Sequence, residues 1–179
     1  MTLAKHIEYT TDRLIIREPI QSDAIDIYKN YTQNPNVTKY LTWVPHKSLD
    51  ETKKWIEYCI QNATTDTCIN RVIVYKENNQ AIGMFDFQFH GFHTHFGYVL
   101  AKEYWNKGLM TEAMQQAVDY YHHLPSIYRI WAVHDIDNPA SGRVMTKLGL
   151  KYEGTLKRYT IHPNLSNEPR DVCMYALTR

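Results

Sequence analysis

The chain has 179 residues, 44% of them hydrophobic and 22% charged, and 20 Lys and Arg residues against 19 Asp and Glu residues give a net charge of +1. This length and composition predict one folded domain, residues 1–179, and exclude disordered, collagen-like and coiled-coil proteins. The near-neutral charge argues against nucleic acid as a partner, because binding along a nucleic acid needs an excess of Lys and Arg.

The first half of the chain predicts a strand and two helices. Residues 13–17 (RLIIR) place apolar and β-branched side chains between charges, as a short strand does. Residues 22–31 carry apolar side chains at helical spacing, and the Asn-Pro pair that follows ends this helix. A second helix is predicted over residues 48–62, which begin with the capping-box pattern S-x-x-E.

The second half predicts most of a β-sheet. Two β-prone runs, residues 71–75 and 81–89, flank a polar turn and predict a hairpin. A third strand over residues 94–100 leads into a helix over residues 109–121. This order predicts an α/β fold with a mixed, mostly antiparallel central sheet flanked by helices. The remaining elements are a strand, a helix and two strands, at residues 128–133, 138–148, 151–159 and 171–177.

Neither a membrane span nor a disulfide pattern is visible in the chain. No apolar stretch approaches the roughly 18 residues of a membrane span, and the N-terminus lacks the apolar region of a signal peptide. We therefore expect a cytoplasmic protein without a membrane partner. Cys59, Cys68 and Cys173 are widely spaced, so we expect reduced, buried and inert thiols with no disulfide or zinc site.

The most informative stretch is residues 96–114, FGYVLAKEYWNKGLMTEAM, in which a strand runs through a polar loop into a helix. The free N–H groups and positive dipole end of a helix N-terminus favour an anionic group such as a pyrophosphate. Gly108 would let that backbone approach the group closely. One glycine before a helix is a weak signal, and an ordinary loop is the simpler interpretation of it alone.

Longer patterns make this signal specific. Residues 97–114 resemble motif A of the GNAT N-acetyltransferases, and residues 137–158 (DNPASGRVMTKLGLKYEGTLKR) resemble their motif B. Residues 11–28 also resemble the N-terminal pattern TxRLxLRxxxxxDAxxxY of the subgroup typified by the ribosomal-protein N-terminal acetyltransferases RimJ and RimL. The resemblance covers almost the whole chain. It implies a single-domain GNAT (acyl-CoA N-acyltransferase) fold and an enzyme that transfers an acetyl group from acetyl-CoA to a primary amine.

The resemblance also implies where acetyl-CoA, the cosubstrate, binds. Its pantetheine arm would pair with strand backbone between the strand ending near Leu100 and the strand near Ile130, and its pyrophosphate would meet N–H groups of residues 105–111. Asn138 and Ser141 would bond the cofactor, cap the following helix, or do both. The implied cofactor-binding residues are Tyr98, Val99, Leu100, Trp105, Asn106, Lys107, Gly108, Leu109, Met110, Thr111, Asn138 and Ser141.

Two positions depart from the family pattern. Met110 stands where the family usually has Ala or Gly, so its bulk is expected to shift the cofactor geometry without preventing binding. Met145 stands where many members have a Tyr that protonates the departing thiolate, and a thioether cannot donate a proton. We therefore expect Ser141, another tyrosine or water to protonate the thiolate, unless it leaves unassisted.

A histidine is the candidate general base. The amine must lose a proton before it attacks, and related enzymes often carry a Glu near the acetyl group where this chain has His95. Because the ordinary pKa of histidine is about 6.5, His95 suits proton transfer at neutral pH, directly or through water. The alternative is a histidine that lines the substrate pocket without moving a proton. The oxyanion would be met by a strand N–H, which we assign to Val99.

Three histidines close together also suggest a metal site. His90, His93 and His95 fall within six residues, and His93 and His95 would share a strand face. No carboxylate stands at ligand spacing and no metal motif surrounds them, so we expect no metal.

The acceptor is predicted less sharply than the cofactor. The resemblance places Trp43, His46 and His95 at the acceptor site, although aromatic residues there suit a core equally well. A peptide N-terminus, such as that of a ribosomal protein, is favoured as the acceptor, and small amines such as polyamines or antibiotics are the alternative. A non-catalytic acyl-CoA-binding module also fits the departures, whereas a generic adaptor would need no cofactor motif. A homodimer is expected only by analogy.

Overall fold

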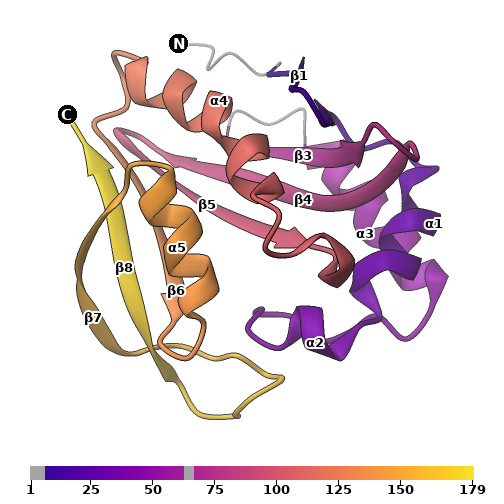
Figure 1. Ribbon diagram of the computed structural model, residues 1–179. Helices are drawn as coiled ribbons and strands as arrows, with labels where there is room; N and C mark the ends of the chain where they lie inside the picture. Colours follow the sequence, from indigo (N-terminus) through magenta and orange to yellow (C-terminus); the bar gives the residue numbers. More distant parts are fainter. Residues whose placement is uncertain (1–6, 63–66) are drawn as a thin grey trace.

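The computed structural model describes residues 7–62 and 67–179, and its strands form one sheet of eight (Figure 1). The strand order is β1-β2-β3-β4-β5-β6-β8-β7. All neighbouring strands are antiparallel except β5 and β6, which are parallel. The strands are β1 Tyr9–Thr10, β2 Leu14–Arg17, β3 Cys68–Tyr75, β4 Gln80–His90, β5 His93–Leu100, β6 Arg129–Asp135, β7 Lys151–Thr160 and β8 Arg170–Thr178.

Helices cover both faces of the sheet (Figure 1), with α4 and α5 on one face and α1 and α3 on the other. The predicted mixed sheet flanked by helices is therefore confirmed. The helix expected over residues 22–31 changes at Tyr28 into a π-helical turn, and β1 and α2 were too short to show a period in the sequence. The helical segments are α1 Asp23–Ile27, η1 Tyr28–Thr32, α2 Pro35–Thr38, α3 Leu49–Asn62, η2 Lys102–Tyr104, α4 Leu109–His123 and α5 Pro139–Lys147.

Alternation along β4 divides the core between the two faces. Phe85 and Phe87 point toward α4, where the Phe87 ring lies 4.8 Å from that of Tyr121 between centroids. Met84 points the other way, into a second cluster with α1 and α3. Full burial of a Phe or Met side chain stabilises the fold by about 1.5–3 kcal/mol. Burial on both faces holds the middle of the sheet rigidly in place.

The sheet opens between β5 and β6. These strands pair only where residues 93–95 face residues 129–131, and the rest of β5, residues 96–100, has no strand partner on that side. On its other edge, β6 pairs with β8. The separation leaves a passage between the two faces of the sheet, and the candidate site lies in it.

The described residues include all three cysteines and all the helices that could be tested as membrane spans. Cys59, Cys68 and Cys173 are free thiols; Cys59 is buried, whereas Cys68 and Cys173 are partly exposed, so the expectation that all three are buried is wrong for these two. Burial raises the pKa of Cys59 to about 12. Within residues 7–62 and 67–179, no helix has the length and apolar character needed to cross a membrane.

Candidate active site

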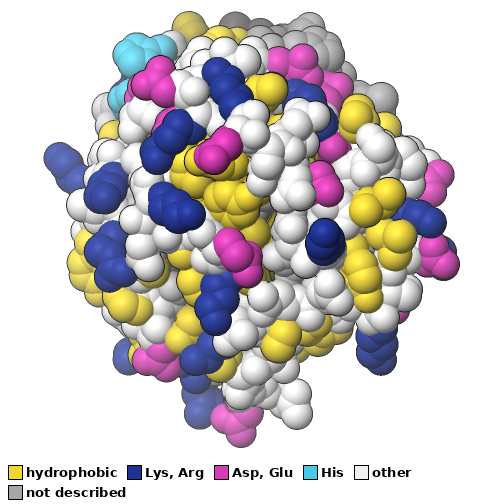
Figure 2. Space-filling view, turned by 45° about the vertical axis from the view of Figure 1, so that its right-hand side comes forward, with side chains coloured by type: hydrophobic (Ala, Val, Ile, Leu, Met, Phe, Trp, Pro, Cys, Tyr) yellow, Lys and Arg dark blue, Asp and Glu magenta, His cyan; other side chains and the backbone are white. Residues whose placement is uncertain are grey.

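A cavity of about 960 Å³ occupies the opening between β5 and β6. It is bordered by the start of α4, by α5 and by the loop between β7 and β8. Figure 2 shows a face of the molecule on which an exposed patch of hydrophobic side chains is bordered by several Lys and Arg side chains and by a few Asp and Glu side chains. Such surroundings favour a ligand with both anionic and apolar parts. The basic residues that line the cavity are Lys39, Lys102, Arg143 and Lys147.

The loop before α4 has the geometry of an anion-binding turn. Asn106 and Gly108 both have positive φ angles, 59° and 77°, and Gly108 is the N-cap of α4. Left-handed residues next to a helix start turn several N–H groups toward one point, where the helix dipole adds positive charge. The sequence-based interpretation of this loop as a phosphate site is thus matched by its backbone.

An ion pair from Arg13, the residue just before β2, holds this loop against the sheet. Arg13 Nε donates to Glu112 in the first turn of α4 at 2.7 Å, and Arg13 Nη1 donates to the Lys107 carbonyl at 3.1 Å. Burial raises the pKa of Glu112, but hydrogen bonds from Thr11 and Arg13 outweigh it and hold that pKa below its usual range. Arg13 therefore positions the anion-binding loop without lining the cavity.

The two methionine departures have a common structural explanation. Met110 and Met145 are 5% and 1% exposed, and both lie in the core between α4, α5 and the sheet. Most of the bulk of Met110 is buried in the core, although Met110 and Met145 also border the first cavity. Met145 likewise packs as a core residue.

Strand alternation decides which backbone groups of β5 face the opening. Ala101 N donates to β4 at 2.8 Å, and Trp105 Nε1 donates to Leu100 O at 2.7 Å. Polar backbone groups alternate between the two edges of a strand, so those of Tyr98 and Leu100 face the opening and those of Val99 face β4. The Val99 N–H therefore faces β4 and not the opening, contrary to the role expected for it, whereas the N–H groups of Tyr98 and Leu100 face the opening.

A pair of hydroxyls joins β5 to α5 across the opening. Tyr98 Oη lies 2.6 Å from Ser141 Oγ and also donates to Ser141 O at 3.0 Å. Burial raises the pKa of Tyr98 well above its usual value, so the phenol stays protonated at neutral pH. Asn138 is the N-cap of α5 but makes no side-chain capping bond, and Ser141 bonds Tyr98 instead. Asn138 therefore stands at the predicted cap position without a side-chain capping bond, and the Ser141 side chain does not cap the helix.

A polar stripe runs along one face of β4 and β5 toward the opening. The His95 ring stacks on Trp131 at 4.6 Å and on His90 at 5.2 Å between centroids. Burial, followed by the nearby His90 and His93, lowers the pKa of His95. His95 is therefore neutral at pH 7, and its Nδ1 is buried with no hydrogen-bond partner among the described residues.

Asp86 ends this stripe and is the residue that sequence reasoning missed. It faces Gly97 across the two strands, and a side chain at Gly97 would meet Asp86 Oδ1 at 3.0 Å. Burial raises the pKa of Asp86 to about 6, although Gln88 Nε2 donates to its carboxylate at 3.1 Å. A lone Asp within a strand gives no sequence signal, because its burial depends on pairing with Gly97.

A second cavity of about 560 Å³ adjoins the first. Asp86, Gln88 and residues 97–99 line both cavities, so the two meet at the open edge of β5. Trp43, Trp55 and Tyr58 line the second cavity on the side of α3. The passage through the sheet thus has a basic half and an aromatic half.

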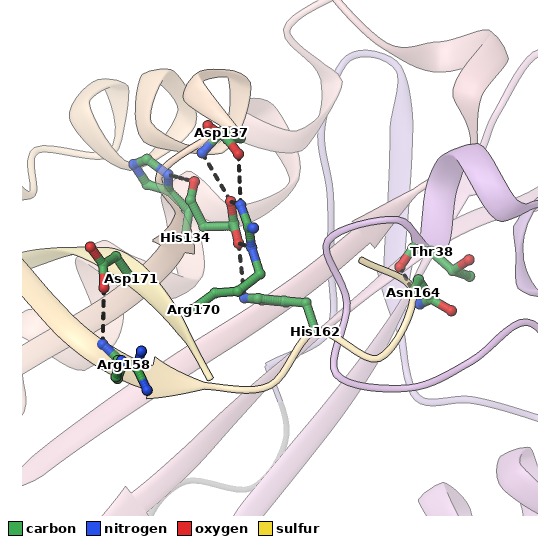
Figure 3. A network of polar contacts seen from close by, with 9 residues as sticks. Thr38, His134, Asp137, Arg158, His162, Asn164, Arg170 and Asp171 are labelled. Atoms are coloured by element: carbon green, nitrogen blue, oxygen red, sulfur yellow. Dashed lines mark hydrogen bonds and ion pairs between the residues drawn. The ribbon is translucent and has the colours of Figure 1, made fainter. Parts of the chain in front are cut away.

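The wall opposite β5 is an ion-pair network at the end of β6 (Figure 3). Arg170 donates to the buried Asp135 at 2.6 and 3.0 Å and to Asp137 at 2.6 Å. Burial raises the pKa of Asp135, but hydrogen bonds from Arg170 and a backbone N–H outweigh it and lower that pKa. His162 lies beside this network, with Nε2 3.7 Å from Asp135 Oδ2.

Asn164 fastens the loop between β7 and β8 to the segment after α2. Its Nδ2 donates to the Thr38 carbonyl at 2.7 Å (Figure 3). It also donates to the Trp43 carbonyl at 2.8 Å. Residues 39–42 line the first cavity and residues 41–43 line the second. Asn164 therefore fixes a wall shared by both cavities.

Most of the predicted site residues come together here. The first cavity is lined by His95 and by every predicted cofactor-binding residue except Lys107, whose Nζ lies over the Tyr104 ring at 5.3 Å. Trp43 lines the second cavity, whereas His46 lines neither and packs between Trp43 and Trp55. In the part of the chain that is described, no group of three or more His, Cys, Asp or Glu residues is placed to hold a metal ion.

Comparison with known proteins gives a consistent result. A family model described as an acetyltransferase (GNAT) domain matches residues 13–151. An uncharacterized N-acetyltransferase, p20, from Bacillus licheniformis is 30% identical over 83% of this chain and 85% of its own length. The [ribosomal protein uS5]-alanine N-acetyltransferase of Escherichia coli is 26% identical over 96% of this chain and 91% of its own.

Solved structures resemble the chain over nearly its whole length. A GNAT-family acetyltransferase from Bacillus anthracis superposes with a TM-score of 0.82 at 25% identity, covering 96% of this chain and 98% of that one. RimL, a ribosomal L7/L12 α-N-protein acetyltransferase solved with coenzyme A, gives 0.83 at 22% identity, with 95% and 96% covered. At the lower identity the likeness concerns the fold alone.

Proposed function

Since the chain belongs to the GNAT acetyltransferase family, in its RimJ/RimL-like subgroup, we propose that it transfers the acetyl group of acetyl-CoA to a primary amine. The observation that carries this proposal is the passage between β5 and β6, which has an anion-binding turn on one side and Asp86 on the other. Amine and thioester can meet there without leaving the protein. Holding two reactants at reacting distance is worth effective molarities of about 10⁵–10⁸ M.

The residues of the first cavity fit acetyl-CoA, which supplies the acetyl thioester. The turn at Asn106 and Gly108 offers N–H groups to a pyrophosphate, and the basic lining residues offer charge. The free edge of β5 offers the backbone of Tyr98 and the N–H of Leu100 to the amides of a pantetheine arm, as an added strand would pair, while the Leu100 carbonyl accepts from Trp105. The same two N–H groups are the candidates for stabilising the oxyanion.

We propose Asp86 as the group that takes the proton from the amine. Its carboxylate lines both cavities beside the open edge of β5, and a pKa of about 6 leaves it ionised yet basic enough at neutral pH. His95, the base suggested by the sequence, remains the alternative. Its lowered pKa also makes it a free base at neutral pH, but its ring is stacked between Trp131 and His90.

We propose Ser141 as the donor of a proton to the departing thiolate. Its hydroxyl lines the first cavity and is bonded to Tyr98 Oη, which burial keeps protonated. Because neither hydroxyl stays ionised at neutral pH, the pair must regain the proton that Ser141 gives up, and the proton released by the attacking amine balances it. The pair thus takes the role that Met145, buried in the core, cannot fill.

For the acceptor, we favour a peptide α-amino group. Support comes from the relative in Escherichia coli, whose name states that it acetylates an alanine of ribosomal protein uS5. A small amine is the alternative acceptor. A homodimer and a cytoplasmic location stay predictions from the sequence.

Two measurements on the purified protein test this function. Acetyl-CoA at about 100 times its dissociation constant is expected to add about 2.7 kcal/mol to the free energy of unfolding and raise the melting midpoint by several degrees. Thiol release in the presence of amines should then follow saturation kinetics. A thermal shift without turnover of any amine would favour a non-catalytic acyl-CoA-binding module, and no shift would contradict the proposed cofactor site.

A further inference from the structure

The second cavity differs from the first in both charge and lining. Its described lining residues include no Lys or Arg, and Asp86 is their only carboxylate. The first cavity, in contrast, is lined by four Lys and Arg residues. Its carboxylates are Asp86, which the two cavities share, and Asp135 and Asp137, which are both paired with Arg170. A polyanion is therefore favoured on one side of the sheet and a single ammonium group on the other.

The aromatic lining of the second cavity is held rigidly from behind. The Trp43 and Trp55 rings lie 6.5 Å apart between centroids, and His46 contacts both. His46 Nδ1 is bonded to Thr52 Oγ1 at 2.7 Å, and Thr52 is bonded to Thr32 at 3.1 Å in a buried chain. Burial lowers the pKa of His46, so this support is uncharged at neutral pH.

Rigid aromatic surfaces bind apolar groups well, because little side-chain freedom is lost on binding. Apolar side chains complete the floor of the cavity, and they include Met84, which is 4% exposed, and Cys59, which is 2% exposed. The volume of about 560 Å³ lies within the range of small-molecule sites. It is large enough for a bulky group attached next to the reacting amine.

We infer that the second cavity receives an aromatic or large aliphatic group carried close to the amine, so that the acceptor is a bulky monoamine and not a polycation. The inference rests on the proposed function and deepens it by naming the acceptor class. In this arrangement Asp86 meets the ammonium group, and the aromatic walls meet the substituent beside it. The N-terminal residue of a peptide and a free arylalkylamine both present this chemistry.

The test compares four acceptors under saturating acetyl-CoA: 2-phenylethylamine, tetrapeptides beginning with Phe or with Gly, and spermidine. We expect kcat/KM to be about 10- to 200-fold higher for the Phe peptide than for the Gly peptide, as hydrophobic pockets discriminate. Activity with the Phe peptide but not with 2-phenylethylamine identifies a peptide acceptor, and the reverse identifies a small amine. Aromatic rings also bind ammonium groups, so a preference for spermidine would overturn the inference.

Variants of the aromatic wall test whether this cavity causes the selectivity. Trp55→Ala is expected to reduce the preference for Phe over Gly at least tenfold, mainly through KM, while Trp55→Phe retains it. Tyr58→Ala is a second variant at a side chain that is 63% exposed, which makes loss of folding a poor explanation for its effect. Tyr128, which is 59% exposed and lines neither cavity, provides the matched control Tyr128→Ala. Unchanged selectivity in both wall variants would contradict the inference.

Direct binding separates this inference from the proposed function. Calorimetry with the CoA-saturated protein measures the affinity of 2-phenylethylamine for the second cavity without any turnover. Binding that weakens at least tenfold in Trp55→Ala supports the inference even if no amine is acetylated, in which case only the proposed function fails. Turnover of Gly-initiated peptides or spermidine, together with no binding of 2-phenylethylamine, would retain the function and refute the inference.

Discussion

The two halves of the passage through the sheet are built from different parts of the chain. The half proposed to hold the cofactor offers backbone groups of one continuous segment, from Tyr98 on β5 to the N-terminus of α4. The half proposed to hold the acceptor offers side chains that come from separate segments, among them Trp43, Trp55 and Asp86. A backbone site needs a particular local conformation, whereas a side-chain site needs a particular arrangement in space.

This difference explains how one fold can serve many acceptors. Positive φ at Gly108 constrains the residue type at that position, because other side chains are strained there. The residues of the acceptor half lie on rigid elements, and changing one of their side chains leaves the backbone in place. Substitutions in the first half should therefore affect acetyl-CoA, and substitutions in the second should affect the amine alone.

The largest expected effect is at the base. With its pKa at about 6, Asp86 loses its charge as the pH falls through 6, so kcat/KM should decline on the acid side of that value. Asp86→Asn should lower kcat/KM about 10²- to 10⁴-fold and remove this acid limb, with acetyl-CoA binding unchanged. His95→Gln should keep the limb. If the limb instead disappears in His95→Gln and survives in Asp86→Asn, His95 is the base.

The next effect concerns the backbone of the cofactor half. Gly108→Glu strains a residue with φ of 77° and adds a negative charge to the anion-binding turn, so acetyl-CoA should bind about 100-fold more weakly. Gly149→Glu is the matched control, since Gly149 has φ of 89°, is equally open and lines neither cavity. Both variants should lose a similar amount of stability. Only Gly108→Glu should lose the thermal shift, and equal shifts would refute the backbone site.

The same contrast determines what the sequence could predict. The fold was predictable, and so was the strand-turn-helix segment of the proposed cofactor half, because β5, the turn and α4 are adjacent in the chain and carry a motif of fixed spacing. Asp86 was missed because its role depends on the register that sets it against Gly97 on the next strand. His46 was misplaced because an aromatic cluster in a sequence does not show which ring lines a cavity and which supports it.

Contacts across the sheet were equally hidden. Arg13 was recognised within a strand pattern, yet its ion pair with Glu112 joins residues 99 positions apart. The Val99 N–H was misassigned because backbone groups alternate between the two edges of β5, and the sequence does not show which residues face which edge. Long-range pairing and strand phase therefore limit such predictions more than residue identity does.

A smaller effect is expected at the support of the turn. Arg13→Gln removes the ion pair with Glu112 and weakens the hold on the Lys107 carbonyl, so acetyl-CoA affinity should fall about three- to tenfold. Arg13 lines neither cavity, which means that KM for the amine should not change. Glu112→Gln should act similarly, and the double variant should be little worse than either single one. Additive losses would show that the two residues act independently.

The smallest effect should come from the wall shared by both cavities. Asn164→Ala removes two hydrogen bonds to the Thr38 and Trp43 carbonyls, each worth about 1 kcal/mol, and frees the segment that carries Trp43. KM for the amine should rise about two- to fivefold, while kcat and the acetyl-CoA thermal shift change little. Ser166→Ala is the control, because its hydroxyl bonds Glu168 within the same loop. A change in the acetyl-CoA shift larger than the change in KM for the amine would mean that this wall serves the cofactor half, and the division between the two halves would have to be redrawn.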